Sequence, residues 1–199
     1  MSETKVDNSK RTWLIASGCM GAVGAVFTAT PFVESFEPSQ RAKAAGAPVE
    51  VDISGLKAGD KMTVAWRGQP VWIIRRTAAE LAQLPKNDPE LADPKSERPG
   101  FTPVWAKTDW RSIKPEYLVI VGICTHLGCT PDDRFTPGPQ PSLPSDWPGG
   151  FLCPCHGSTY DMSGRVFKNK PAPDNMLVPP YTFLSDSRLL IGEHDKAKA

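Results

Sequence analysis

The chain has 199 residues, with 23 lysines and arginines against 22 aspartates and glutamates, which gives a formal net charge of +1. This near-neutral composition without a basic stripe gives no support to nucleic-acid binding. Five cysteines and three histidines are few enough to be followed one by one along the chain.

A polar stretch ending in Lys10-Arg11 leads into Trp13–Val33, which is uncharged and mainly apolar. A bilayer core needs about 20 such residues, so residues 12–33 predict a single transmembrane anchor. The apolar run exceeds the roughly 7–15 residues of a signal-peptide core. We therefore expect an uncleaved anchor rather than processing near Ala42-Lys43-Ala44. Positive charge before the anchor predicts a cytoplasmic N-terminus and a head domain on the far side.

Residues 1–11 form the expected cytoplasmic segment. Within it, Ser9–Leu14 resembles a twin-arginine export signal in which Lys10 replaces the first arginine. Such a signal suits a domain that folds before it crosses the membrane. Cys19 lies inside the anchor and is expected to be an inert packing residue. The alanine-rich, polar residues 34–48 show no apolar period and predict a flexible linker.

Residues 49–199 are long enough for one compact domain. Short runs of alternating or β-branched residues, two of them flanking Gly68 as a hairpin, predict an antiparallel all-β sandwich. The expected strands are 49–53, 62–66, 71–74, 118–121, 151–152, 159–160, 181–183 and 189–191.

Helical signal is limited to residues 77–84, where Thr77 is a candidate N-cap and Glu80 follows three residues later. Pro85 and the prolines at 89, 94 and 99 are expected to end this helix. Residues 130–150 are dense in proline and glycine and predict a surface excursion, which we interpret as a tolerated insertion rather than a partner contact.

Three polar residues outside the cysteine-containing segments are expected to have no chemical role. Asp132 and Asp133 are interpreted as solvated loop charges, and His194 as a solvated residue of a charged tail.

Two short clusters carry the chemistry: Cys124-Thr125-His126-Leu127-Gly128-Cys129 and Cys153-Pro154-Cys155-His156-Gly157-Ser158. Each offers one thiolate and one imidazole and keeps a second cysteine in reserve. A [2Fe–2S] unit needs two terminal ligands on each iron, so the two cysteines that open the clusters would hold one iron and the two histidines the other. The reserve cysteines, Cys129 and Cys155, could form a disulfide between the clusters.

Three other interpretations use the same residues. A Cys₂His₂ zinc site would leave the second cysteine pair unexplained. A four-cysteine ferredoxin cluster would leave both histidines idle. A purely structural framework of two disulfides would place both histidines beside cysteines by chance.

The two clusters closely resemble the C-T-H-x-G-C and C-P-C-H-G-S motifs of Rieske iron–sulfur proteins, in particular the subunit of the cytochrome bc1 complex (ubiquinol–cytochrome c reductase). The resemblance implies a [2Fe–2S] cluster held by Cys124, His126, Cys153 and His156, with a disulfide between Cys129 and Cys155. It also implies that Ser158 donates a hydrogen bond to a bridging sulfide and Tyr160 one to a ligand cysteine sulfur. Both bonds would raise the reduction potential.

The resemblance extends beyond the clusters. Pro171-Ala172-Pro173, followed by Val178–Tyr181, is similar to the family's proline loop, a third segment that covers the cluster. Lys170 departs from the family pattern, which has glycine before Pro-Ala-Pro. The implied fold is a Rieske-type β-sandwich whose cluster-binding subdomain spans about residues 118–180.

The resemblance implies a role in quinol oxidation. His156 would take a proton from quinol as the cluster takes one electron, and the electron would pass to a c-type cytochrome within respiratory proton translocation. Leu127 would either pack beside the cluster or be buried as an ordinary loop residue. Cytochrome b and cytochrome c1 subunits are the implied partners, in a dimeric complex of the bacterial inner membrane with the head on the periplasmic side.

An alternative function is electron carriage by a Rieske ferredoxin that serves another redox enzyme. Such ferredoxins generally lack the second cysteine pair and need no membrane anchor, so the chain favours the quinol-oxidising interpretation. An oxygenase subunit is weaker still, because His194 alone remains for a mononuclear iron.

Overall fold

The computed structural model describes residues 8–39, 44 and 46–194, which belong to two compact units divided after Ala44. The first unit contains helix α1 (Asn8–Glu34), which includes the whole predicted anchor. This helix of 27 residues is long enough and apolar enough to cross a membrane, judged by length and composition, and its described side chains are not buried in the protein. Cys19 is an exposed free cysteine on this helix.

The second unit, the head, is built from three antiparallel sheets of three strands each, as the predicted all-β class requires. The first sheet has the order β1 (Val49–Asp52), β9 (Arg188–Ile191), β8 (Tyr181–Phe183). The second has the order β2 (Lys61–Trp66), β3 (Gln69–Arg75), β4 (Tyr117–Val121). The third has the order β5 (Asp132–Arg134), β6 (Gly150–Leu152), β7 (Thr159–Asp161).

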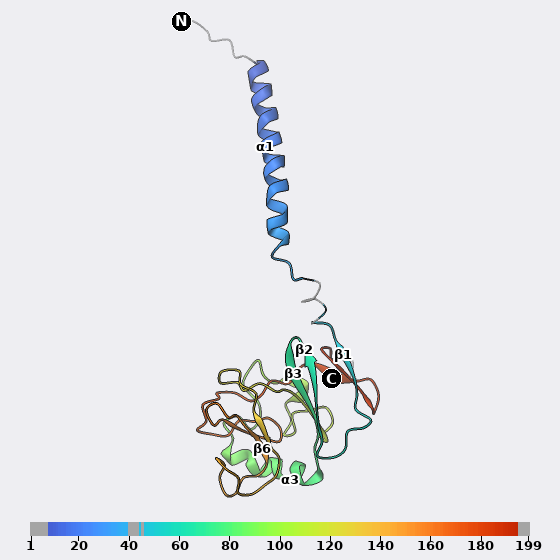
Figure 1. Ribbon diagram of the computed structural model, residues 1–199, viewed down its shortest axis with the longest axis vertical. Coiled ribbons are helices and arrows are strands. Elements are labelled where there is room, and N and C mark those ends of the chain that lie inside the picture. The colour runs from blue at the N-terminus through green and yellow to red at the C-terminus, as the bar shows by residue number, and fades with distance from the viewer. Residues whose placement is uncertain (1–7, 40–43, 45, 195–199) are drawn as a thin grey trace. The chain divides into compact units, whose positions relative to one another are not determined.

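The predicted hairpin around Gly68 is confirmed, and β2 and β3 lie side by side (Figure 1). Their closing pair is Trp66 opposite Gln69, and the two residues between them have positive φ, 50° at Arg67 and 72° at Gly68. Two successive residues of positive φ make the type I′ turn whose twist matches antiparallel strands.

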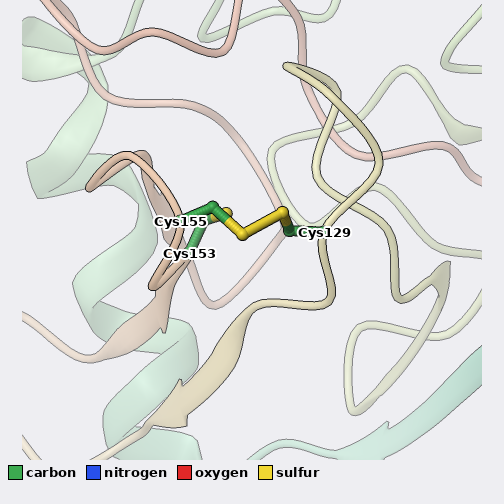
Figure 2. Close-up of side chains that lie close together, drawn as sticks. All are labelled: Cys129, Cys153 and Cys155. Carbon is green, nitrogen blue, oxygen red and sulfur yellow. A yellow bond between two sulfur atoms is a disulfide. The ribbon is translucent and has the colours of Figure 1, made fainter.

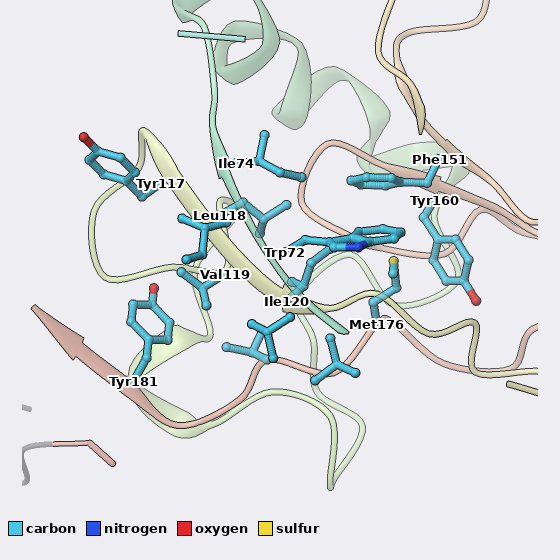
Figure 3. Close-up of a cluster of buried hydrophobic side chains, with 14 of the residues drawn as sticks. Trp72, Ile74, Tyr117, Leu118, Val119, Ile120, Phe151, Tyr160, Met176 and Tyr181 are labelled. Carbon is cyan, nitrogen blue, oxygen red and sulfur yellow. The ribbon is translucent and has the colours of Figure 1, made fainter. Parts of the chain in front are cut away.

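The core lies between the sheets, where every residue of β4 is buried. In Figure 3 the indole of Trp72 on β3 lies against the ring of Phe151 on β6; their centroids are 5.2 Å apart and stacked. The same indole fills the space beside Gly122, where an added Cβ would approach it to 2.2 Å. Trp72 therefore joins two sheets and requires glycine at position 122, two residues before the first cysteine cluster.

Helix α3 (Ala78–Asn87) begins as predicted with a capping box. The Glu80 amide donates to Thr77 Oγ1 over 3.3 Å, and the Thr77 amide donates to Glu80 Oε2 over 2.7 Å. The prediction that Pro85 ends the helix is wrong, since α3 continues to Asn87 and is followed by the 3-10 turn η1 (Asp88–Glu90). In the last turn a proline removes one amide bond only, and its carbonyl accepts the amide of Asp88.

Strand β5 was not predicted. Asp132 and Asp133 belong to it and pair with Leu152 and Phe151 of β6, so they are not loop residues, although both side chains are exposed as expected. An edge strand with polar side chains lacks the apolar alternation that marks a strand in sequence. Lys61 on β2 forms an ion pair of 2.6 Å with Asp133.

The prediction that His194 is solvated is wrong. Its ring stacks on Trp105 at a centroid distance of 4.2 Å, and its Nδ1 lies 2.9 Å from the carbonyl oxygen of Tyr181. Trp105 is part of the 3-10 turn η2 (Val104–Ala106). Aromatic stacking and a hydrogen bond thus hold this part of the C-terminal segment against β8.

A buried ion pair closes the end of β7. Arg165 Nη2 lies 2.7 Å from Asp161 Oδ2, with both side chains fully buried, and Arg165 Nη1 lies 2.8 Å from Asp88 Oδ1. Burial alone would lower the pKa of Arg165, but Asp161 and Asp88 together outweigh it and the pKa is raised. Arg165 therefore links the third sheet to Asp88 at the end of α3.

Candidate metal centre

The two cysteine-containing loops leave the same end of the third sheet. Asp132, Leu152 and Thr159 are aligned across β5, β6 and β7. Residues 124–129 come just before β5, and residues 153–158 connect β6 to β7. Strand register therefore brings together two loops separated by more than twenty residues of chain.

The two loops have the same backbone hydrogen bonds. In the first, the Cys124 amide donates to Cys129 O over 2.8 Å and the Gly128 amide to Cys124 O over 3.1 Å. In the second, the Cys153 amide donates to Ser158 O over 2.7 Å and the Gly157 amide to Cys153 O over 3.0 Å. The fifth residue of each loop has positive φ, 84° and 75°, and in both loops it is glycine, the residue that this conformation favours.

The predicted disulfide is confirmed. Cys129 and Cys155 are joined by an S–S bond of 2.07 Å, with Cα atoms 6.6 Å apart (Figure 2). The sulfurs of Cys129, Cys153 and Cys155 all lie within 4.8 Å of one another. Sulfurs in a disulfide are not thiolate ligands, so Cys153 alone of these three keeps a free thiol. The disulfide is incompatible with the alternative in which all four cysteines bind iron.

The two free thiols of the head, Cys124 and Cys153, are buried. Burial raises the pKa of the Cys153 thiol, and the Cys124 thiol raises it further, although the amides of Cys155 and His156 act in the opposite direction. A metal ion would displace the thiol protons and use both sulfurs as thiolates.

The two histidines of these loops lie next to each other. The rings of His126 and His156 have centroids 4.8 Å apart and are nearly perpendicular, at 86°. The His126 side chain is half-buried, whereas His156 is exposed. Two buried thiols and two adjacent imidazoles on the same two loops form a donor set that fits a [2Fe–2S] cluster with cysteine ligands on one iron and histidine ligands on the other.

Tyr160 reaches this donor set, and Ser158 lies at the end of the second loop. The Tyr160 hydroxyl donates to Cys124 Sγ over 3.2 Å and accepts the Thr125 amide over 3.1 Å. Burial raises the pKa of Tyr160, and the contact with Cys124 raises it further, so the phenol stays protonated as a donor. Ser158 Oγ is buried and accepts the Ala172 amide over 3.0 Å, which leaves its own proton to be donated.

The proline loop, residues 171–174, contacts both cysteine-containing loops. Besides the bond from Ala172 to Ser158, the carbonyl of Asp174 accepts the Thr125 hydroxyl over 2.6 Å. Sequence reasoning did not single out Thr125 as a link among the loops, although a threonine between two predicted ligands was a signal available for it. The residue with positive φ in this segment is Asn169, at 55°, so Lys170 does not adopt the conformation that favours glycine.

Leu127 is 71% exposed, so the alternative of ordinary loop burial is wrong. Its side chain is free to contact another molecule at the tip of the first loop, one residue from His126.

Comparison with known proteins assigns the class. The profile of the Rieske [2Fe-2S] domain matches residues 48–182. This stretch contains both cysteine-containing loops and the proline loop, and the chain belongs to the Rieske [2Fe–2S] family.

Relatives that match nearly the whole chain have names more specific than that of the family. The ubiquinol-cytochrome c reductase iron-sulfur subunit of Allochromatium vinosum is 54% identical over 97% of this chain and 93% of its own length. The protein of the same name from Blastochloris viridis is 39% identical over 96% and 97%. Among solved structures, a chain titled Hyperthermophilic respiratory Complex III aligns with a TM-score of 0.46 and 27% identity, over 88% of this chain and 97% of that one. The family assignment does not depend on this last alignment.

Proposed function

We propose that this chain is the iron–sulfur subunit of a ubiquinol–cytochrome c oxidoreductase. The observation that carries the proposal is the convergence of two buried thiols and two neighbouring imidazoles on loops joined by a disulfide. Relatives named as this subunit, which match nearly the whole chain, give it further support.

Cys124 and Cys153 would bind one iron and His126 and His156 the other. When bound, such a cluster accepts and releases one electron at a potential of roughly −150 to +300 mV. The hydroxyls of Tyr160 and Ser158 direct positive dipole ends toward the sulfurs, which favours the reduced state and raises the potential. The disulfide keeps the two loops together independently of the metal bonds.

His156 is the residue we propose to meet the substrate. Its ring is exposed, so the nitrogen that does not bind iron is available to accept a hydrogen bond and then a proton from a quinol hydroxyl. Leu127, exposed on the neighbouring loop, would pack against the same partner surface and restrict water near the reacting groups. The electron would then pass to a c-type cytochrome.

Helix α1 would anchor the subunit in the bacterial inner membrane by a single pass. Lys10 and Arg11, near the start of the helix, support a cytoplasmic N-terminus and a head on the periplasmic side, where the disulfide is stable. Cytochrome b and cytochrome c1 subunits are the proposed partners, in a dimeric complex. The anchor and the disulfide both favour this function over a soluble electron carrier.

The test uses the full chain in its membrane. Electron paramagnetic resonance of ascorbate-reduced membranes should give a Rieske signal, with a positive midpoint potential at neutral pH and a b-type cytochrome that co-purifies with the chain. A cluster with a midpoint potential well below zero and no cytochrome would support the carrier function, and the absence of any cluster signal would refute both.

A further inference from the structure

Residues 93–101, which we call the strap, run along the segment that follows the proline loop. The side-chain amide of buried Asn175 donates to Asp93 O over 2.9 Å and to Ser96 Oγ over 3.1 Å. Further along, the Val178 amide donates to Phe101 O over 2.9 Å. Hydrogen bonds at both ends of the strap thus hold it against residues 175–178.

Arg98 extends from the strap to the proline loop itself. Its Nη1 donates to the carbonyl oxygen of Pro173 and lies 3.3 Å from Asp174 Oδ1. The backbone that carries Arg98 is fixed by the buried carboxylate of Asp93, which accepts the Glu97 amide over 2.9 Å and the Arg98 amide over 3.1 Å. The direction of the guanidinium is therefore set by the fold of the strap.

Two hydrogen bonds join the proline loop to the metal centre, and they are made by the two residues next to Pro173. Ala172, on one side of Pro173, donates its amide to Ser158 Oγ. Asp174, on the other side, accepts the hydroxyl of Thr125 at its carbonyl oxygen. A shift of the backbone at Pro173 would displace both contacts.

The hydrogen bond to Pro173 is the stronger part of this interaction. The Arg98 side chain is 47% exposed, and an ion pair at that exposure contributes little Coulomb energy. A charged donor on a carbonyl oxygen makes a stronger, directional bond. This geometry therefore restrains the position of the backbone at Pro173 more than it supplies charge attraction.

We infer that Arg98 is a positioning residue for the metal centre: it holds Pro173 and Asp174 so that the Ala172 amide keeps the Ser158 hydroxyl directed at the cluster. The inference rests on the proposed function, because the role of Ser158 requires a cluster between the loops. It adds a residue outside both cysteine-containing loops to those that set the reduction potential.

The experiment compares full-length wild-type protein with Arg98→Gln in membranes. Redox titration followed by electron paramagnetic resonance should give a lower midpoint potential and altered signal positions for the variant, since the Ser158 donor loses its alignment. Chelator-driven loss of the cluster signal should be about fivefold faster, the factor that one lost hydrogen bond produces. Unchanged potential, spectrum and loss rate would overturn the inference.

Arg188→Gln is the matched control. Arg188 on β9 also has an exposed side chain, 60%, and an ion pair of 2.8 Å with Glu50 on β1, but it belongs to a different sheet from the metal-bearing loops. Its potential and spectrum should equal those of the wild type. An equal change in both variants would overturn a specific role for Arg98.

Asp93→Ala separates position from charge. Removal of a negative charge would by itself raise the potential, whereas release of the strap should lower it, as in Arg98→Gln. A raised potential would mean that Arg98 acts through charge alone and would overturn the inference. If Asp93→Ala does not accumulate, Asp93→Asn also removes the negative charge that accepts the Glu97 and Arg98 amides and is judged by the same sign.

The proposed function and the positioning role of Arg98 would be refuted by different results. A wild-type chain without a Rieske signal would refute the proposed function. A wild-type chain with the signal, together with an Arg98→Gln variant identical to it, would refute the positioning role and leave the proposed function intact.

Discussion

The hydroxyl of Tyr160 donates a hydrogen bond of 3.2 Å to the sulfur of Cys124, although the two residues are 36 positions apart in the chain. Tyr160 lies on β7, directly after the second cysteine-containing loop, and Cys124 opens the first. A strand at the root of one loop thus supplies a donor to a predicted ligand on the other.

Tyr160→Phe removes this donor and keeps the ring. We expect the cluster to assemble and its midpoint potential to fall by on the order of 50 mV, because one hydrogen bond contributes about 1 kcal/mol and about 59 mV corresponds to a tenfold change for one electron. Redox titration in membranes measures the shift. Tyr117→Phe, at a buried tyrosine of β4, should leave the potential unchanged; equal potentials in all three proteins would contradict the role of Tyr160.

His156→Asn tests the proposed ligand set. We expect loss of the Rieske signal and of bound iron, because the second iron would keep one imidazole only. Iron content per chain and the electron paramagnetic resonance spectrum are the measurements. His194→Asn is the control, since His194 packs on Trp105 away from the two loops, and it should keep both iron and signal. Retention of a normal signal by His156→Asn would remove His156 from the ligand set.

The paired substitution Cys129→Ser with Cys155→Ser removes the disulfide. A bridge that closes 26 residues contributes about 3.5 kcal/mol in the chain-entropy account, so the loops should separate more readily. We expect faster loss of the cluster to a chelator and a lower melting temperature of the head. Cys19→Ser, in α1, should change neither quantity. Equal rates of cluster loss would show that the metal bonds alone hold the loops.

Asp161→Asn breaks the buried pair with Arg165. Removal of one partner from a buried ion pair costs about 3–5 kcal/mol, and because Arg165 keeps Asp88 the free energy of unfolding of the head should fall by the lower end of this range, about 3 kcal/mol. Chemical unfolding followed by circular dichroism measures it. Glu50→Gln breaks the exposed pair with Arg188 and should cost less than about 1 kcal/mol. Similar losses in the two variants would mean that burial of the pair does not matter.

Alkaline pH should destabilise the head through Tyr181. Burial raises the pKa of this phenol above its ordinary value of 10.0, although the Ile113 amide and Arg76 act in the opposite direction. Below pH 10.0 the phenol is neutral in both states; above it, the unfolded chain loses the proton first and the free energy of unfolding falls. Unfolding at pH values on either side of 10.0 should show a shallower decline for Tyr181→Phe. Parallel declines would exclude this tyrosine as a cause.

Much of the head could be predicted because its strands are short runs of alternating or β-branched residues and its helix carries a full capping box. The runs 62–66 and 71–74, which flank Gly68, predicted the hairpin, and Thr77 with Glu80 predicted the start of α3. Strand β5 was missed because its polar residues form an edge, and pairing with β6 depends on residues far along the chain. Pro85 misled because a proline tolerated in the last turn looks the same in sequence as one that breaks a helix.

The candidate ligands and the disulfide were accessible because thiols and imidazoles are rare in this chain and their spacing is distinctive. The strap was not. Asp93 and Arg98 bond to backbone amides and to a backbone carbonyl, and Ser96 bonds to the side chain of a residue 79 positions away, so none of these contacts leaves a trace in the sequence pattern. Stacking of His194 on Trp105 was also missed, because neither residue belongs to a periodic sequence pattern.

The matching backbone of the two loops gives each position in one loop an equivalent in the other. Cys124 corresponds to Cys153 and Gly128 to Gly157, but the histidines are offset by one position. The equivalent of His156 is Leu127, and both are exposed. A leucine and an imidazole therefore occupy the same place on two near-copies of one turn, so a docking partner would meet an apolar contact and a proton acceptor at equivalent sites.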